Sequence, residues 1–311
     1  MKYCVLIILS LLIFSLLVDN YNCNKLPSGN IIVGYTNWGE CDEKVITAVQ
    51  NGVNVVIWFS INLISDAKGN PLIDDSKINS QCIAEVALAL KMQNLPTTHL
   101  ISIGGWNAPH IDTKFSAKQW WSLLESWNKN VIAKPMLGFH GFDGLDIDLE
   151  GNDDLSSEFN TFTIQQMDLV GNLCQLAKKG NWVVSIAPPQ SYLDIGTDEF
   201  SLSVTHRPAW KTDFPYEGKN TYAYILSKFK YTTIEESDTN NTNSITRELI
   251  HTFDIVSIQL YEGWSRANYE LNDLKVPLKD FMYKLIKTMN DGWNVNLPYT
   301  NSVIILITNI I

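Results

Sequence analysis

The repeated alternation of short apolar runs with longer amphipathic segments is the feature that most constrains the fold of this chain. Several runs are continuous stretches of Val, Ile and Leu, as is typical of parallel strands covered by helices. Strands are predicted at Ile31–Tyr35, Val53–Ser60, His99–Gly105, Phe142–Glu150, Trp182–Pro188, Phe253–Tyr261 and Ser302–Thr308. Helices are predicted at Cys82–Met92, Ala117–Ile132, Ser157–Lys178 and Leu278–Met289.

This alternation predicts an α/β fold, and specifically a TIM (β/α)8 barrel. An open doubly wound sheet is the alternative, but no glycine-rich dinucleotide-binding turn follows the first strand. The sequence stops at Ile311, directly after the last predicted strand, so we expect a barrel that lacks its eighth strand and helix. Open strand edges are prone to aggregate, so we expect poor solubility and weak activity of this form. The barrel domain is assigned to residues 29–311.

The N-terminus has the pattern of a secretory signal peptide. Met1-Lys2-Tyr3 precedes an apolar run that ends at Val18, and polar residues follow it. The run is short for a transmembrane helix, which needs about 20 residues. We therefore predict a signal peptide at residues 1–19 and a secreted protein, or one delivered to a secretory vacuole or lysosome. An uncleaved membrane anchor is the alternative.

Composition excludes some classes of partner and restricts the cysteine chemistry. A net charge of −10 argues against nucleic acid and anionic membrane, and leaves neutral polymers and small molecules. After the signal peptide, Cys23, Cys41, Cys82 and Cys174 remain, and in an oxidising compartment they permit two disulfides with three possible connectivities. Buried free thiols at Cys82 and Cys174 are the alternative. No cysteine spacing resembles a zinc site, and we expect no metal or cofactor.

The segment between Gln190 and Thr252 is longer than one helix and its loops require. We interpret it as an insertion after the fifth predicted strand, on the face where barrel loops build active sites. It contains the glycosylation sequon Asn240-Asn241-Thr242, which is plausible on a surface loop.

The run from Gly141 to Glu150 places three acids at alternate positions of a predicted strand. Asp146, Asp148 and Glu150 would share one face, because successive side chains of a strand point to opposite sides. Unpaired buried charge is expensive, so such a cluster predicts acid catalysis rather than stabilisation. A Mg²⁺ or Ca²⁺ site is the alternative, although no second carboxylate cluster ends a neighbouring strand.

Together with the run from His99 to Trp106, this motif resembles glycoside hydrolase family 18, which contains chitinases and endo-β-N-acetylglucosaminidases. The DxxDxDxE signature of that family is met by Asp143, Asp146, Asp148 and Glu150. Its SxGG signature is met by Ser102, Gly104 and Gly105. Supporting likenesses are Gly34-Tyr35, Ala187-Pro188 and Gln259-Leu260-Tyr261.

The resemblance implies a role for each acid. Glu150 would be the general acid that protonates the glycosidic oxygen, and Asp146 and Asp148 would titrate with it as a coupled group. The family is one of the substrate-assisted exceptions to two-carboxylate glycosidases, so the substrate's own acetamido oxygen would attack. Asp148 would accept the acetamido N–H and Tyr261 would donate to its carbonyl oxygen. Asp143 would be structural.

Sugar rings stack on aromatic faces, so aromatic residues near strand ends are candidates for substrate binding. The predicted binding residues are Tyr35, Phe59, Gly105, Trp106, Gln259 and Trp264. Ser102 and Gly104 belong to the structural motif, in which glycines allow close backbone approach. Two positions depart from the family pattern: Leu149, where an aromatic residue is usual, and Glu262, where Asp or Asn is usual.

The sequence therefore predicts a monomeric, secreted glycosidase that hydrolyses β-1,4 bonds of N-acetylglucosamine polymers such as chitin. Two alternatives remain open. One is a non-catalytic, lectin-like relative that binds chitin or oligosaccharides, although such proteins usually lack the terminal Glu that this chain has at position 150. The other is an endo-β-N-acetylglucosaminidase that acts on glycoproteins.

Overall fold

The computed structural model describes residues 26–36, 41, 44–204, 218–237, 245–261, 265–299 and 303–305. Several predictions fall outside these ranges: the signal peptide at residues 1–19, Cys23, the sequon at Asn240, and Trp264. Within the described ranges, no helix combines the length and the hydropathy that crossing a membrane requires.

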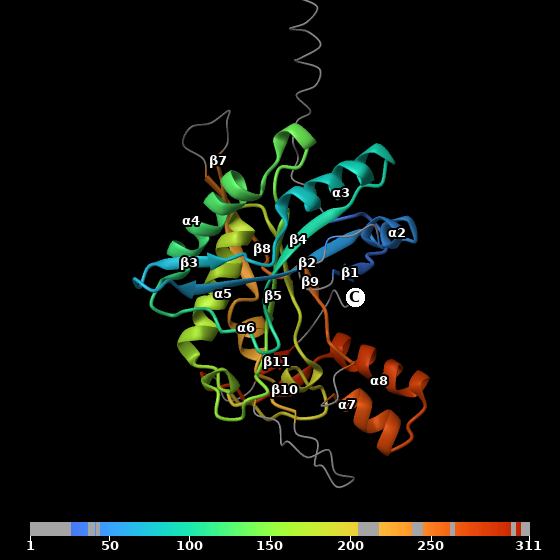
Figure 1. The fold of residues 1–311 in the computed structure, drawn as a ribbon. Helices are drawn as coiled ribbons and strands as arrows, with labels where there is room; N and C mark the ends of the chain where they lie inside the picture. Colours follow the sequence, from blue (N-terminus) through green and yellow to red (C-terminus); the bar gives the residue numbers. More distant parts are fainter. Residues whose placement is uncertain are drawn as a thin grey trace, which may run out of the picture.

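The core of the fold is a parallel sheet in which each strand lies beside the next one along the chain (Figure 1). Its parallel strands are β1 (Val33–Tyr35), β2 (Val55–Ser65), β4 (Thr98–Gly105), β5 (Gly144–Leu149), β6 (Val183–Ile186) and β9 (Ile255–Val256). A short antiparallel strand, β3 (Pro71–Asp74), pairs with the far end of β2. This sequential order is that of a barrel rather than of a doubly wound sheet, whose order reverses at a switch point. The predicted α/β class and the incomplete barrel are confirmed.

The sheet curls, because a side chain of β1 reaches β5 across its interior. The Tyr35 hydroxyl lies 3.4 Å from both carboxylate oxygens of Asp146, although β2 and β4 separate their strands in the sheet. Strands lie about 4.8 Å apart, so three spacings would keep these strands about 14 Å apart in a flat sheet. The contact therefore requires strong curvature, with the acids on the concave face.

Helices return the chain between successive strands. The first four are α2 (Lys44–Gln50), α3 (Ser80–Met92), α4 (Ala117–Trp127) and α5 (Ile164–Lys179). Figure 1 shows α4 and α5 side by side. Short 3-10 and π turns are η1 (Asn128–Ile132), η2 (Pro135–Leu137) and η3 (Glu158–Asn160).

The helix predicted from Ser157 begins later than expected. Ser157 caps only the short turn η3, and α5 starts after Thr163. The Thr163 side chain accepts from the Gln166 amide while the Gln166 side chain accepts from the Thr163 amide, which is a reciprocal capping box. This box satisfies two backbone donors and sets the start of α5.

Alternate residues of the strands form two apolar layers, as the period of two requires. Residues such as Val56, Ile101 and Leu145 belong to the large core cluster that also contains the apolar faces of the helices. A smaller cluster belongs to the concave face and consists of Val55, Ile57, Leu100, Val183 and Ile255. Toward the C-terminal ends of the strands the side chains on this face become polar, as at Ser102, Asp146 and Ser185. The candidate site therefore lies directly above this apolar cluster.

The long segment after β6 has structure of its own. It contains η4 (Gln190–Tyr192), α6 (Ala223–Lys228) and an antiparallel hairpin of β7 (Tyr231–Ser237) and β8 (Ile245–His251). After β9 come α7 (Arg266–Asn268), η5 (Tyr269–Asp273), α8 (Leu278–Asp291), β10 (Trp293–Val295) and β11 (Val303–Ile305).

The prediction of a seventh barrel strand is wrong. Its core, β11, pairs antiparallel with β10 in a separate two-stranded sheet instead of lying beside β9. A nearby antiparallel partner satisfies the backbone groups of β11 locally, and Trp293 and Val295 of β10 are buried. An apolar run alone could not distinguish this partner from a barrel neighbour.

One of the two permitted disulfides lies within the described residues. Cys41, ahead of α2, is bonded to Cys82 on α3. Cys174 on α5 is a free thiol buried in the core. The alternative of a buried thiol is therefore wrong for Cys82 and confirmed for Cys174.

We predict that Cys82→Ala lowers the free energy of unfolding by about 2–4 kcal/mol, because the bond closes a long loop and restricts the unfolded chain. Urea denaturation with and without a thiol reductant measures the effect. The reductant should destabilise the native protein to a similar extent and leave Cys82→Ala unchanged. Equal stability of oxidised and fully reduced native protein would contradict the prediction.

Candidate active site

The three acids of the motif lie on the concave face of β5, at its C-terminal end. Asp146 is fully buried, and Asp148 and Glu150 are 5% and 8% exposed. In the parallel register Ser102 of β4 is opposite Asp146, and Gly104 is opposite Asp148. The period-two prediction for these side chains is confirmed.

Asp146 lies in a layer of hydroxyl donors. Ser102 Oγ donates to its Oδ2 at 2.9 Å, and the Tyr35 hydroxyl is within 3.4 Å of both oxygens. Ser185 of β6 is the register neighbour on the other side. Burial raises the pKa of Asp146 to about 6, and hydrogen bonds from Ser102 and Tyr35 act in the opposite direction because they stabilise the ionised form.

Asp148 and Glu150 form a pair that is bridged by the amide of Gln259. Gln259 Nε2 donates to Asp148 Oδ1 at 2.8 Å and to the Ala187 carbonyl at 2.9 Å, with a longer contact of 3.5 Å to Glu150 Oε1. Burial, followed by the charges of Glu150 and Asp146, raises the pKa of Asp148 well above its ordinary value. Burial also raises the pKa of Glu150 to about 7.

The electrostatics of this pair keep a proton on it near neutral pH. Two carboxyls in contact cannot easily ionise together, so they titrate as a coupled unit. Burial raises the pKa of both groups, so one proton is shared between them rather than belonging to either carboxyl alone. The arrangement can therefore store a proton and exchange it between two oxygens.

Tyr261 is an exposed side chain whose hydroxyl reaches into the site. Its residue is 83% exposed, and its hydroxyl donates to Gln259 Oε1 at 2.9 Å. Because an amide oxygen only accepts, this bond fixes the orientation of the Gln259 amide, with Nε2 facing the carboxylates.

The paired glycines allow two close approaches that any side chain would block. A Cβ at position 105 would lie 2.3 Å from the Phe59 ring, and one at position 104 would lie 2.5 Å from the Asp148 carbonyl oxygen. Both glycines have a positive φ, +103° at Gly104 and +112° at Gly105, which other residues rarely adopt. Phe59 is only 8% exposed, so in this structure it packs against β4, while Trp106 is half-buried.

Asp143 lies ahead of β5 and joins it to β4. Its Oδ2 accepts from the His99 amide at 2.8 Å, and its own amide donates to the His99 carbonyl at 2.7 Å. These contacts hold the two strands in register at the opposite end from Glu150, which supports the predicted structural role. Trp264 lies outside the described residues.

Several supporting residues were not predicted. The Tyr222 hydroxyl accepts from the Leu149 amide at 2.8 Å and donates to the Leu149 carbonyl at 2.9 Å. The Tyr192 hydroxyl accepts from the Gly151 amide at 3.1 Å, and His110 Nε2 donates to the Glu150 carbonyl at 2.9 Å. These contacts hold the end of β5 from three separate segments.

Ser185 could have been found from the sequence, because it occupies an inward position of a predicted strand beside the acids. Tyr222 and Tyr192 could not, because they belong to a long segment without a periodic pattern. Among the residues that the structure describes, no group of three or more His, Cys, Asp or Glu side chains is arranged to hold a metal ion.

Comparisons with known proteins give distant relatives. No protein-family model matches the chain. It is 26% identical over 207 residues to endochitinase 37 of Trichoderma harzianum, across 61% of this chain and 56% of that protein. It is 27% identical over 234 residues to endochitinase 4 of Metarhizium robertsii, across 68% and 63% of the two. A solved family GH18 chitinase from Chromobacterium violaceum is 13% identical, with a TM-score of 0.48 over 91% of this chain and 65% of that one.

The two fungal relatives confirm the resemblance to chitinases that the sequence motifs predicted: this chain is similar to fungal endochitinases. The matched region spans 56% of the length of the Trichoderma protein and 63% of that of the Metarhizium protein.

We predict that the buried acids make the protein less stable at alkaline than at acidic pH. The pKa of Glu150 is raised from 4.5 to about 7, so its contribution is fully present below about pH 4.5 and is lost as pH rises through 7. Glu150→Gln should therefore be more stable than native protein at about pH 8, by on the order of 2–3 kcal/mol, and gain less at about pH 5. Urea denaturation at the two pH values measures this difference. Glu158→Gln, at an exposed carboxyl, is the control, and an equal gain at both pH values would contradict the prediction.

Proposed function

We propose that this protein hydrolyses β-1,4 bonds of N-acetylglucosamine polymers such as chitin by a substrate-assisted, retaining mechanism. The observation that carries the proposal is the buried Asp148–Glu150 pair, which Gln259 bridges at the end of β5. A general acid needs a pKa near the working pH, and burial raises the pKa of Glu150 to about 7. The similarity to fungal endochitinases supports the choice of substrate.

In the first step, Glu150 gives its proton to the glycosidic oxygen as the bond to the anomeric carbon breaks. The carbonyl oxygen of the substrate's own 2-acetamido group forms a bond to that carbon, which produces an oxazolinium ion and releases the leaving sugar. No protein carboxylate has to attack. The internal nucleophile is already close, and correct orientation of such a group can lower the barrier substantially.

Asp148 and Tyr261 are proposed to orient the acetamido group. Asp148 would exchange its contact with Gln259 for the acetamido N–H, which leaves a carboxylate beside the developing positive charge. The Tyr261 hydroxyl, which donates to Gln259 Oε1 in this structure, would instead donate to the acetamido oxygen. Asp146 would share the remaining proton, since its pKa is also raised, to about 6, by burial.

In the second step, the ionised Glu150 removes a proton from water. The resulting hydroxide equivalent bonds to the anomeric carbon, the oxazolinium ring opens, and the acetamido group is restored. Glu150 ends the cycle protonated, so it needs no external proton donor.

The proposal includes a binding path for a neutral polymer. Tyr35, Trp106 and Tyr261 retain exposed surface near the acids and offer rings on which sugars can stack. Phe59 would support the path from below, and Trp264 would extend it. We also propose a secreted monomer, with a signal peptide at residues 1–19 and the catalytic domain at residues 29–311.

We predict that Glu150→Gln abolishes hydrolysis of N-acetylglucosamine oligomers and leaves their binding largely intact, because it removes the acidic proton but preserves shape. Product release by chromatography and affinity by calorimetry measure the two effects. Glu125→Gln, at an exposed carboxyl of α4, is the matched control and should keep native turnover. More than a small fraction of native turnover in Glu150→Gln would contradict the assignment, and oligomer binding without turnover in the native protein would indicate a lectin.

We also predict that Asp148→Asn lowers turnover by about 100-fold and flattens the acidic limb of its pH profile. The limb reflects the first ionisation of the coupled pair, which the amide cannot undergo. Turnover measured from about pH 3 to pH 9 tests this effect. A lower rate with an unchanged profile would mean that the two groups are not coupled.

A further inference from the structure

Gln259 is held on its backbone as well as through its side chain. Its amide donates to the Pro188 carbonyl at 3.0 Å, and its carbonyl accepts from the Gln190 amide at 3.1 Å. These bonds extend the pairing of β6 with β9 beyond the two residues of β9 itself. A strand of two residues makes few backbone hydrogen bonds. The position of the segment that carries Gln259 therefore depends on its contacts with neighbouring segments.

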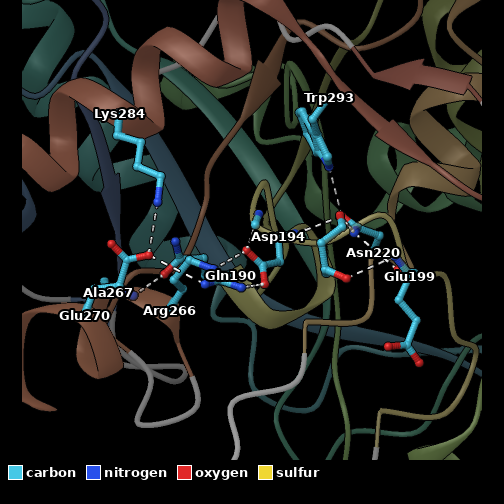
Figure 2. Close-up of polar contacts among 11 residues, drawn as sticks. Gln190, Asp194, Glu199, Asn220, Arg266, Ala267, Glu270, Lys284 and Trp293 are labelled. Atoms are coloured by element: carbon cyan, nitrogen blue, oxygen red, sulfur yellow. Dashed lines mark hydrogen bonds and ion pairs between the residues drawn. The ribbon is translucent and has the colours of Figure 1, made fainter. Parts of the chain in front are cut away.

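Arg266 and Ala267 are tied to the loop that carries Gln190 and Asp194 (Figure 2). The Ala267 amide donates to Gln190 Oε1 at 2.8 Å. The Arg266 guanidinium makes a two-pronged contact with Asp194, from Nε to Oδ1 at 2.6 Å and from Nη2 to Oδ2 at 2.7 Å. Asp194 is fully buried and Arg266 is mostly buried, so water screens this ion pair little.

Asp194 is in turn fixed from its other side. Its amide donates to Asn220 Oδ1 at 2.9 Å, and Trp293 Nε1 of β10 donates to the same oxygen at 3.3 Å. Its Oδ1 also accepts from the Gly196 amide at 2.9 Å. The anchor for Arg266 is therefore itself held by hydrogen bonds, and Figure 2 shows Asp194 and Asn220 at the centre of these contacts.

We propose that Asp194, Arg266 and Gln190 form a clamp that positions Gln259 against Asp148 and Glu150. The clamp residues touch neither carboxylate, so they act as positioning residues. They hold both ends of the segment Gln259–Arg266, and the Gln259 amide within it can then keep its 2.8 Å bond to Asp148. The inference rests on the proposed function only for its kinetic consequence.

The clamp sets how strongly Gln259 stabilises the ionised pair. An N–H donated to a carboxylate favours its charged form, and Gln259 lowers the pKa of both Asp148 and Glu150. Loosening Gln259 should therefore raise the pair's pKa values. The other titratable groups near the pair are Asp146, Tyr35, Tyr192, Tyr222 and His110, and none of them is one of the three clamp residues.

Arg266→Lys tests the clamp, because it keeps the charge but cannot make the two-pronged contact. We expect the titration of Asp148 and Glu150, followed by NMR of carboxyl carbons in substrate-free protein, to move upward by about half a pH unit. The alkaline limb of hydrolysis should move with it, and turnover should fall by about 3- to 10-fold. Lys287→Met is the matched control, because it removes an exposed charge of α8 whose ion-pair partner is Asp291 rather than a clamp residue, and it should leave the titration unchanged.

A lower melting temperature with an unchanged carboxyl titration would show a purely structural role and overturn the proposal. If Arg266→Lys does not fold, Gln190→Met removes only the bond from the Ala267 amide, and the same upward shift is expected. No shift in that variant would equally overturn the clamp. The NMR titration needs no turnover, so absence of hydrolysis by the native protein would refute the proposed function and leave the test of the clamp intact.

Discussion

The rest of the site depends on burying three carboxyl groups along one face of a single strand. Each of them would lose several kcal/mol of solvation if it ionised alone, so their surroundings must supply donors or keep a proton. Hydroxyls from β1 and β4 supply donors to Asp146, and the Gln259 amide supplies one to Asp148. These donors come from strands on both sides of β5, and only a curled sheet can bring them to one point. Burial of these carboxyl groups therefore requires the curvature of the sheet and also raises the pKa values of the acids.

Much of this arrangement could be predicted from the sequence, because strands and their faces follow a simple period. The alternation at Asp146, Asp148 and Glu150 correctly placed all three acids on one face at a strand end. The apolar runs predicted the positions of the parallel strands. The paired glycines predicted a close backbone approach, and Gly105 lies against the Phe59 ring. These features are local, so a short window of sequence contains the information.

What could not be predicted depends on which distant segment supplies the partner. The run at β11 looked like a barrel strand, yet β10 pairs with it, and pairing is a property of two segments. The predicted helix began at Ser157, but Ser157 caps only the turn η3, while the reciprocal pair of Thr163 and Gln166 caps α5. The bridging role of Gln259 was also missed, since it needs Tyr261 to orient the amide.

The hydroxyl of Tyr222 has a consequence for how a protein of this type could diversify. It bonds both backbone groups of Leu149, between the two paired acids, and it belongs to the long segment that follows β6. Loops on a barrel are usually free to vary, which is how one scaffold acquires new specificities. Here a tyrosine of the long segment also holds the strand that carries the three acids. Grafting a foreign segment would therefore displace the end of β5 and change the pKa values of Asp148 and Glu150, unless the graft brought an equivalent tyrosine.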